Sequence, residues 1–283
     1  MGYSYDIGKY PVTAGQYTAF LNAVAATDTY GLYNTKMGTY DWGCQIQRSG
    51  SPGSYTYSVA ADYADRPVNY VSWGDAARFA NWLHNGQPTG VQGPGTTETG
   101  AYTLNGAMTL SELSEVSRNA DWRWAITSEN EWYKAAYYDP DTNSYYDYPT
   151  SQNSVPGRDM NDVLGNNANY IGDPFPIDSP YYTTIVGHFH NSVSPYGTFD
   201  QGGNVWEWTE AQVEFPWASY RCLRGGSFIY GVHSLHASSR HSDLPTIEYD
   251  VIGFRVSRVP EPASLALLAL GGVGKLWRRQ VVC

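Results

Sequence analysis

The chain has 283 residues, of which 42% are hydrophobic, 15% aromatic and only 16% charged, a composition that excludes a disordered chain, a coiled coil and a charge-rich helical repeat. Its 27 acidic and 17 basic residues give a net charge of −10, which would repel a phosphate backbone, so nucleic acid is not an expected partner. The 25 tyrosines and 29 glycines indicate a loop-rich fold in which large rings fill the core.

The first predicted element is a helix that begins after Thr13, which can cap its N-terminus. Four apolar side chains then recur with helical spacing: Tyr17, Phe20, Leu21 and Val24. Residues 29–64 show no helical period, and a turn at residues 50–53 leads into a predicted short strand at residues 55–59.

Two further helices are predicted by capping boxes. Ser72–Asp75 begins one, which ends at residues 85–86, and Ser128–Glu131 begins the other, which ends before residues 139–140. The chain between and after these helices is rich in turns, and residues 100–104 are expected to form a strand. Loops of such length are uncommon unless they are functional or held by ions or aromatic packing.

The three cysteines, Cys44, Cys222 and Cys283, form no CxxC pair and no metal-ligand spacing. Neither a zinc site nor a disulfide framework is therefore predicted, although a single Cys44–Cys222 bridge stays open for an exported protein. Residues 1–6 contain neither the basic nor the apolar region of a secretory signal peptide.

Six short motifs follow one another along the chain: residues 10–17 (YPVTAGQY), 66–73 (RPVNYVSW), 127–132 (TSENEW), 203–208 (GNVWEW), 224–228 (RGGSF) and 253–256 (GFRV). In this order they resemble the sulfatase-modifying factors, the formylglycine-generating enzyme family. The resemblance runs from about Tyr5 to Arg258. It implies one α+β domain over residues 1–258, related to the C-type lectin fold, with long ordered loops, short strands and the three helices predicted above.

The same resemblance implies two calcium ions, which prefer about six to eight oxygen ligands. The first would be bound by two carboxylates and two backbone carbonyl oxygens, those of Asp200 and Glu207 and of Gly203 and Val205. The second would be bound by two side chains and two carbonyl oxygens, those of Asn169 and Asp178 and of Tyr170 and Pro180.

Active members of this family bind copper through two cysteines that follow the Gly-Gly-Ser motif, since thiolates suit Cu(I). Those positions fall here at Tyr230 and near Leu235, and residues 228–240 contain no cysteine. No catalytic residue is therefore assigned, and copper is not an expected cofactor. An alternative nitrogen and oxygen site for copper, iron or zinc would consist of Tyr230, His233, His236 and His241.

The composition changes after Arg258. Residues 259–262 read Val-Pro-Glu-Pro, residues 263–274 carry no charge, and Lys275 and the Arg278-Arg279 pair follow. This run is shorter than the ~20 residues that cross a bilayer as a helix, so it is a marginal membrane segment with basic residues placed to stay in the cytoplasm.

This tail resembles the PEP-CTERM sorting signal of Gram-negative bacteria, which an exosortase processes during export. Residues 259–283 are therefore predicted to be a sorting and anchor segment with transient or terminal membrane association. The protein is expected at the cell surface or in the extracellular matrix. Because such tails accompany an N-terminal signal peptide and none is visible, we expect the chain as given to begin after its leader.

The favoured function is a calcium-stabilised binding module of the surface or matrix that has lost copper chemistry. The expected binding groove, by analogy with lectin-like folds, would take a glycan or a peptide on aromatic and polar side chains: Ser227, Tyr230, His233, His236 and Arg240. The alternative is an enzyme, either a formylglycine-generating oxidase that converts a sulfatase cysteine or a related oxidoreductase with a rearranged metal site. A structural matrix protein without a discrete ligand is a third hypothesis.

Overall fold

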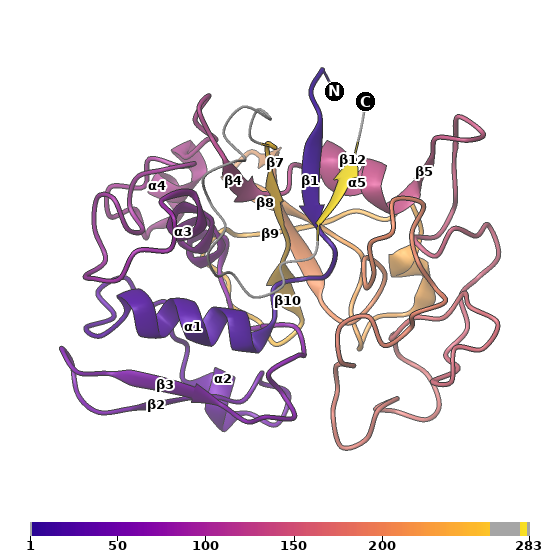
Figure 1. Ribbon diagram of the computed structural model, residues 1–283, viewed down its shortest axis with the longest axis horizontal. Helices are drawn as coiled ribbons and strands as arrows, with labels where there is room; N and C mark the ends of the chain where they lie inside the picture. The colour runs from indigo at the N-terminus through magenta and orange to yellow at the C-terminus, as the bar shows by residue number, and fades with distance from the viewer. Residues whose placement is uncertain (1, 261–277, 282–283) are drawn as a thin grey trace, which may run out of the picture.

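The computed structural model describes residues 2–260 and 278–281, and two four-stranded sheets stand at its centre (Figure 1). The first sheet is antiparallel throughout, with the order β12 (Arg278–Val281), β1 (Tyr5–Gly8), β11 (Val256–Arg258) and β4 (Trp124–Ile126). The second has the order β10 (Ile252–Phe254), β7 (Trp206–Phe215), β8 (Ala218–Arg224) and β9 (His241–Asp243). Its β10–β7 pair is parallel and its other pairs are antiparallel.

A single residue joins the two sheets. Ile252–Phe254 pairs with β7, and Val256–Arg258 pairs with β1 and β4, so Arg255 stands where the chain passes from one sheet to the other. The side chain of Arg255 is fully buried. A buried guanidinium needs partners for its donors, and those partners lie in the candidate site described below.

The three predicted helices are confirmed, each with its capping box: α1 (Ala14–Val24), α3 (Trp73–His84) and α5 (Glu129–Tyr137). The described residues also contain three short helices that the apolar pattern did not reveal: α2 (Lys36–Thr39), α4 (Leu110–Glu115) and a 3-10 turn at Val232–Leu235. Helix α4 has a capping box of its own, Thr109 with Glu112, so its sequence signal was present although the helix is too short to show a period.

The strand predictions hold in part. Residues 56–59 form β3 and pair with β2 (Ile46–Ser49), and two short strands, β5 (Tyr138–Asp139) and β6 (Ser144–Tyr145), follow α5. The expected strand at residues 100–104 is wrong. Gly100 has a φ of 151°, and Tyr102 makes a single bridge with Arg118 instead of a ladder.

The main core lies between the second sheet and the helices α1 and α3, which Figure 1 shows on the left of the molecule with the β2–β3 hairpin. Buried rings cross-brace it: Tyr17 contacts Phe20, Phe79 and Phe254 at centroid distances of 5.4 to 6.5 Å. Residues 146–205 form the loop-rich right-hand part and contain only isolated bridges.

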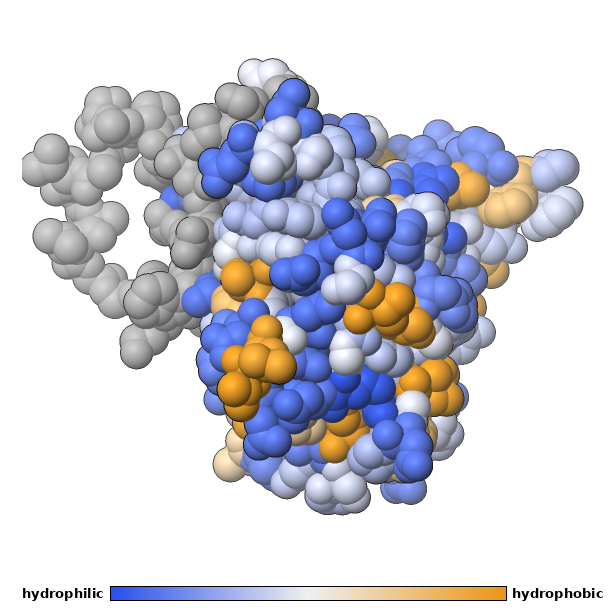
Figure 2. All heavy atoms as spheres, turned by 90° about the vertical axis from the view of Figure 1, so that its right-hand side faces the viewer, coloured by the Kyte–Doolittle hydropathy of each residue, from blue (hydrophilic) through white to orange (hydrophobic). Residues whose placement is uncertain are grey.

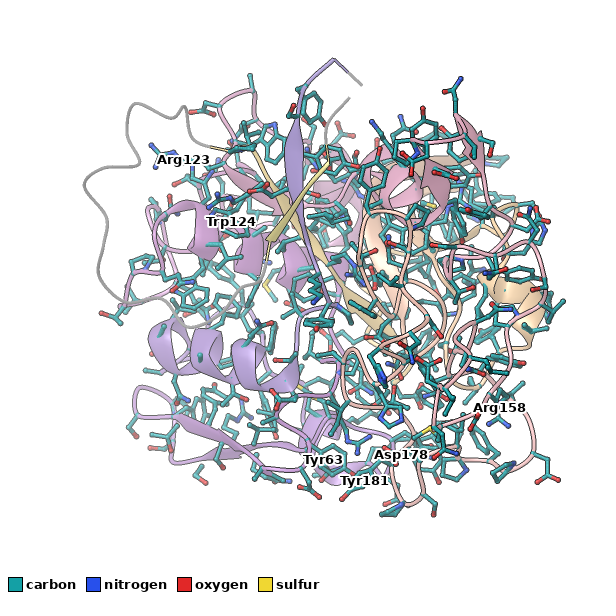
Figure 3. The ribbon with its side chains drawn as sticks, turned by 45° about the vertical axis from the view of Figure 1, so that its right-hand side comes forward. Tyr63, Arg123, Trp124, Arg158, Asp178 and Tyr181 are labelled. Atoms are coloured by element: carbon teal, nitrogen blue, oxygen red, sulfur yellow. The ribbon has the colours of Figure 1, made fainter. Side chains whose placement is uncertain are left out.

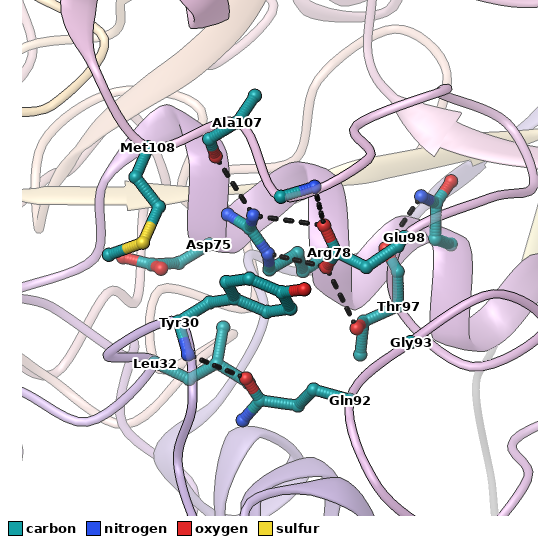
Figure 4. A network of polar contacts seen from close by, with 12 residues as sticks. Tyr30, Leu32, Asp75, Arg78, Gln92, Gly93, Thr97, Glu98, Ala107 and Met108 are labelled. Carbon is teal, nitrogen blue, oxygen red and sulfur yellow. Dashed lines mark hydrogen bonds and ion pairs between the residues drawn. The ribbon is translucent and has the colours of Figure 1, made fainter.

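An ion pair buried beside α3 holds another long loop in place. Arg78 donates from Nε and Nη2 to the two carboxylate oxygens of Glu98, at 2.8 and 3.1 Å, and the ring of Tyr30 lies 4.5 Å from the guanidinium (Figure 4). Arg78 also donates to the carbonyl oxygen of Ala107. These contacts order the loop between α3 and α4 without regular secondary structure.

Cys44 and Cys222 are both free and buried, so the bridge left open by the sequence does not form. Burial raises the pKa of each thiol to about 11, which keeps both protonated and unreactive at neutral pH. Cys283 and the apolar segment 263–274 lie outside the described residues, and within those residues no helix has the length and apolarity to cross a bilayer.

Candidate functional site

The centre of the predicted calcium site is a buried carboxylate with three donors. Glu207, on β7, accepts from Arg255 Nε (3.0 Å to Oε2) and Nη2 (2.9 Å to Oε1) and from Trp132 Nε1 (2.6 Å to Oε2). All three side chains are fully buried. A carboxylate has about four lone-pair positions, so one acceptor position, on Oε1, is left beside these three bonds.

The second carboxylate of this predicted set lies at the start of the loop that leads into β7. Asp200 accepts from the backbone N–H of Gly187 at 2.6 Å and from the amide of Asn204 at 3.4 Å. Burial raises its pKa to about 6, and the charge of Glu207 adds to this shift while Arg255 opposes it. Two carboxylates thus share the neighbourhood of one guanidinium, which leaves an excess of negative charge.

The loop between them has a backbone shape that its residues favour. Asp200, Gly203 and Asn204 have φ values of 58°, 84° and 59°, in the left-handed region that Gly, Asn and Asp tolerate best. Gly203 pairs with Asn169, and a Cβ at Gly203 would overlap the carbonyl oxygen of Asn169. The two predicted calcium sets are therefore neighbours in space, joined through Gly203 and Asn169.

Two members of the second predicted calcium set already accept hydrogen bonds from arginines. Arg66 donates from Nη1 to Asp178 at 2.8 Å, and its guanidinium lies 3.7 Å from the ring of Tyr181; Figure 3 shows Asp178 and Tyr181 close together. Arg158 donates from Nε to the carbonyl oxygen of Tyr170 at 2.8 Å.

The other two members of the second set have local constraints. The Asn169 amide donates to the carbonyl oxygen of Tyr182 and to Asn204 Oδ1, both at 2.9 Å. Pro180 follows a cis peptide bond.

The positions of the family's copper ligands hold no metal-binding pair. The Tyr230 ring is 37% exposed and lies edge-on to Trp206 at 5.5 Å. Leu235 is fully buried and packs with Tyr148 and Ala168. A phenol ring and an aliphatic side chain do not replace two thiolates as copper ligands, so the residues present do not fit that metal.

The alternative metal site does not assemble. His241 packs against Trp206, while His236 lies beside Tyr148 and 3.7 Å from Asp147. No group of three or more His, Cys, Asp or Glu side chains suited to a metal gathers within residues 2–260 and 278–281.

The five predicted groove residues have different contacts. Ser227 and Tyr230 lie together, since the N–H of Tyr230 donates to the Ser227 carbonyl oxygen at 3.0 Å. His233 lies in the 3-10 turn and His236 directly follows it. Arg240 donates twice to Glu129 on α5, at 2.8 Å each.

Two buried polar atoms close to Tyr230 have no hydrogen-bond partner in the part of the chain that the structure describes. Among the described residues, neither Ser227 Oγ nor Trp206 Nε1 has a hydrogen-bond partner. Such groups are rare in native interiors and call for an explanation. Trp206 was not among the predicted site residues, although its place in the Gly-Asn-Val-Trp-Glu-Trp motif, one residue before Glu207, was a usable signal.

The loop-rich face of the molecule carries apolar side chains in separate patches with hydrophilic surface between them (Figure 2). Exposed apolar residues of the loops that supply it are Val155, Val163, Leu164, Ile171, Phe175 and Ile185. Ile171 lies next to the candidate groove, because its N–H donates to the carbonyl oxygen of Tyr230 at 3.0 Å.

Solved structures confirm the fold. The chain superimposes on CarF with a TM-score of 0.57 and 20% identity, covering 91% of this chain and 87% of that one. Treponema denticola variable protein 1 (TM-score 0.54, 18% identity) aligns over 90% of this chain and 84% of its own. PvdO from Pseudomonas aeruginosa (TM-score 0.52, 18% identity) aligns over 90% of this chain and 80% of its own.

Two curated relatives match in sequence. Hercynine oxygenase from Mycobacterium tuberculosis is 24% identical over 276 residues, which is 90% of this chain and 52% of the relative. The inactive C-alpha-formylglycine-generating enzyme 2 of Bos taurus is 37% identical over 65 residues, 21% of this chain and 22% of the relative. The chain thus spans about half the length of the first and about a fifth of the second.

Two domain-family models match this chain. The PEP-CTERM protein-sorting motif matches residues 258–280, which indicates an exported protein of a Gram-negative bacterium that an exosortase processes and anchors. Residues 3–260 match the sulfatase-modifying factor enzyme 1-like domain, so the chain belongs to that family.

Proposed function

We propose that this protein is a binding module of the cell surface or matrix that uses the sulfatase-modifying factor fold without copper oxidase chemistry. The observation that carries the proposal is the replacement of the two copper-ligand positions by Tyr230 and Leu235. One is a partly exposed ring and the other a buried aliphatic side chain, and neither supplies a thiolate for copper. The resemblance to an inactive family member also supports a function without oxidase chemistry.

The ligand surface is centred on the exposed ring of Tyr230, with the buried side chains of Trp206 and Ser227 beside it. The exposed ring of Tyr230 is suited to stacking on an apolar face of a ligand, such as a glycan or a peptide. His233 and His236 border this surface in the adjoining turn. Arg240 contributes less, since Glu129 already holds its guanidinium.

Calcium at the first predicted set stabilises the module. Asp200 has no arginine or lysine within salt-bridge distance among the described residues, Glu207 retains one acceptor position, and their combined charge exceeds that of Arg255. Ca²⁺ would be held by these two carboxylates together with the carbonyl oxygens of Gly203 and Val205. The second set remains a prediction with less support, because arginines already hold Asp178 and the Tyr170 carbonyl.

A glycan and peptide array with and without calcium tests the binding function. We expect the purified chain to be retained on defined array members, and Tyr230→Ala to lose retention while Tyr145→Ala, at a more exposed ring elsewhere, keeps it. Failure of the wild type to bind any array member in calcium would contradict the proposal.

The enzyme alternative has one supporting observation, the 24% identity to hercynine oxygenase. It is tested by loading the chain with copper or iron under reducing conditions and following a Cys-x-Pro-x-Arg sulfatase peptide by mass spectrometry. Conversion of the cysteine to formylglycine with stoichiometric metal would establish an oxidase. No conversion, with calcium retained, is the outcome expected of a binding module.

A further inference from the structure

The C-terminal strand of the chain lies on the outer edge of the N-terminal strand. Residues 278–281 (β12) pair antiparallel with Tyr5–Gly8 (β1), in a register that sets Tyr5 opposite Val281 and Gly8 opposite Arg278. Figure 1 shows β12 in yellow beside β1 in indigo. The sorting motif covers residues 258–280, so the basic end of the motif is part of the folded sheet.

Without β12, β1 would be an edge strand. Its other side pairs with β11, through Asp6 with Arg258 and Ile7 with Ser257. In an antiparallel strand, alternate residues direct their N–H and C=O groups to opposite neighbours. Half of the β1 backbone groups therefore depend on β12 for partners within the sheet, and an open edge of this kind is a template for another strand.

The arrangement also fixes both ends of the sorting tail on the domain. β11 and β12 lie on opposite sides of β1 and are both antiparallel to it, so the chain leaves the sheet after Arg258 and rejoins it at Arg278. A tail that crosses a membrane with its arginines on the far side cannot keep those arginines paired with β1. Pairing with β1 and insertion in a membrane are therefore alternative positions of the same residues.

We propose that the outer edge of β1 is a docking site for the C-terminal strand Arg278–Val281, and that docking there competes with insertion of the sorting tail into a membrane. Processing of the tail would leave this edge open, and the C-terminal strand of an unprocessed second copy has the backbone needed to occupy it. This proposal rests on the sheet and on the sorting motif, and it does not depend on the ligand or calcium proposals.

Hydrogen exchange on the full chain tests the docking. In R279P/Q280P, two adjacent prolines remove a ladder hydrogen bond whichever of the two residues faces β1. We expect every second amide of Tyr5–Gly8 to exchange about tenfold faster than in the wild type, while the amides that face β11 stay unchanged. The matched control R279A/Q280A keeps both backbone donors and should exchange like the wild type.

Addition of a synthetic peptide with the sequence of residues 276–282 should restore the lost protection in the proline variant. Equal exchange of β1 in the proline and alanine variants, or no restoration by the peptide, would overturn the docking site.

Partitioning into phosphatidylcholine vesicles tests the competition. Because the proline variant has lost the docked alternative, we expect a larger vesicle-bound fraction for R279P/Q280P than for R279A/Q280A. Equal fractions would show that docking does not compete with insertion.

Discussion

Arg255 and Glu207 form a buried, two-bond ion pair across the boundary between the two sheets, with N···O distances of 2.9 and 3.0 Å. Arg255 stands between β10 and β11, and two of its remaining donors bond the carbonyl oxygens of Gly8 and Phe199. Glu207 is in turn fixed by the indole of Trp132. The pair therefore holds both sheets, helix α5 and the loop of the candidate calcium site in one arrangement.

Removal of one partner of this pair should be costly. In Arg255→Ala the Glu207 carboxylate stays buried without a counter-charge, and loss of one member of a buried pair typically costs about 3–5 kcal/mol. We expect urea unfolding to show a decrease of that size or a failure to fold. The double variant R255M/E207L, which removes both charges, should be more stable than Arg255→Ala; if it is not, the unpaired charge is not the cause.

The effect of calcium on stability should depend on Asp200. Saturating calcium binds only the folded chain and stabilises it, by about 2.7 kcal/mol when its concentration is 100 times the dissociation constant. Thermal unfolding in calcium and in EDTA should therefore differ for the wild type and coincide for Asp200→Asn. The control Asp41→Asn, at an exposed acid outside the site, should keep the wild-type difference. A wild type with equal melting temperatures in both buffers would contradict the calcium proposal.

The free energy of unfolding should also decrease as the pH rises, because of Glu248. Burial, together with the charge of Asp75, raises the pKa of Glu248 to about 8, whereas in the unfolded chain it has its ordinary value near 4.3. The folded chain holds this proton to a higher pH than the unfolded chain, so the contribution is fully present below the ordinary pKa and is lost as the pH rises toward 8.

Urea unfolding between pH 5 and pH 8 measures this effect. Glu248→Gln cannot ionise, so its stability should decrease less over that interval than that of the wild type. Glu115→Gln, at an exposed position, should keep the wild-type slope. A Glu248→Gln profile that parallels the wild type would assign the pH dependence to another group.

The sequence predicted the parts of the fold that depend on local signals. Thr13, Ser72 and Ser128 begin helices because the capping interaction lies within four residues, and the structure contains all three boxes. The strand expected at residues 100–104 failed for a long-range reason. Asn81, on α3, bonds both the N–H and the C=O of Tyr102, and these backbone groups are then not available to a ladder.

The same distinction applies to the candidate site. Motif order was enough to predict Asp200, Gly203 and Glu207 as neighbours, since all three lie within one short segment. The link between Glu207 and Arg255 joins residues 48 positions apart, and the bond between Arg240 and Glu129 joins residues 111 positions apart. Contacts of this range leave no spacing in the sequence, and only the folded chain reveals them.

Gly203 should tolerate no side chain, for two reasons that a control can separate. Its φ is 84°, which costs an L-residue about 1–2 kcal/mol, and a Cβ there would overlap the backbone carbonyl of Asn169. Gly53 also has a positive φ, 95°, but a Cβ there meets nothing within 4 Å. We expect Gly53→Ala to lose about 1 kcal/mol in urea unfolding and Gly203→Ala about 3 kcal/mol or more, because only the second must displace backbone. Since Asn169 belongs to the second predicted calcium set and Gly203 to the first, Gly203→Ala should also weaken calcium stabilisation. Similar losses for the two variants would mean that the close approach of Gly203 to Asn169 does not constrain this loop.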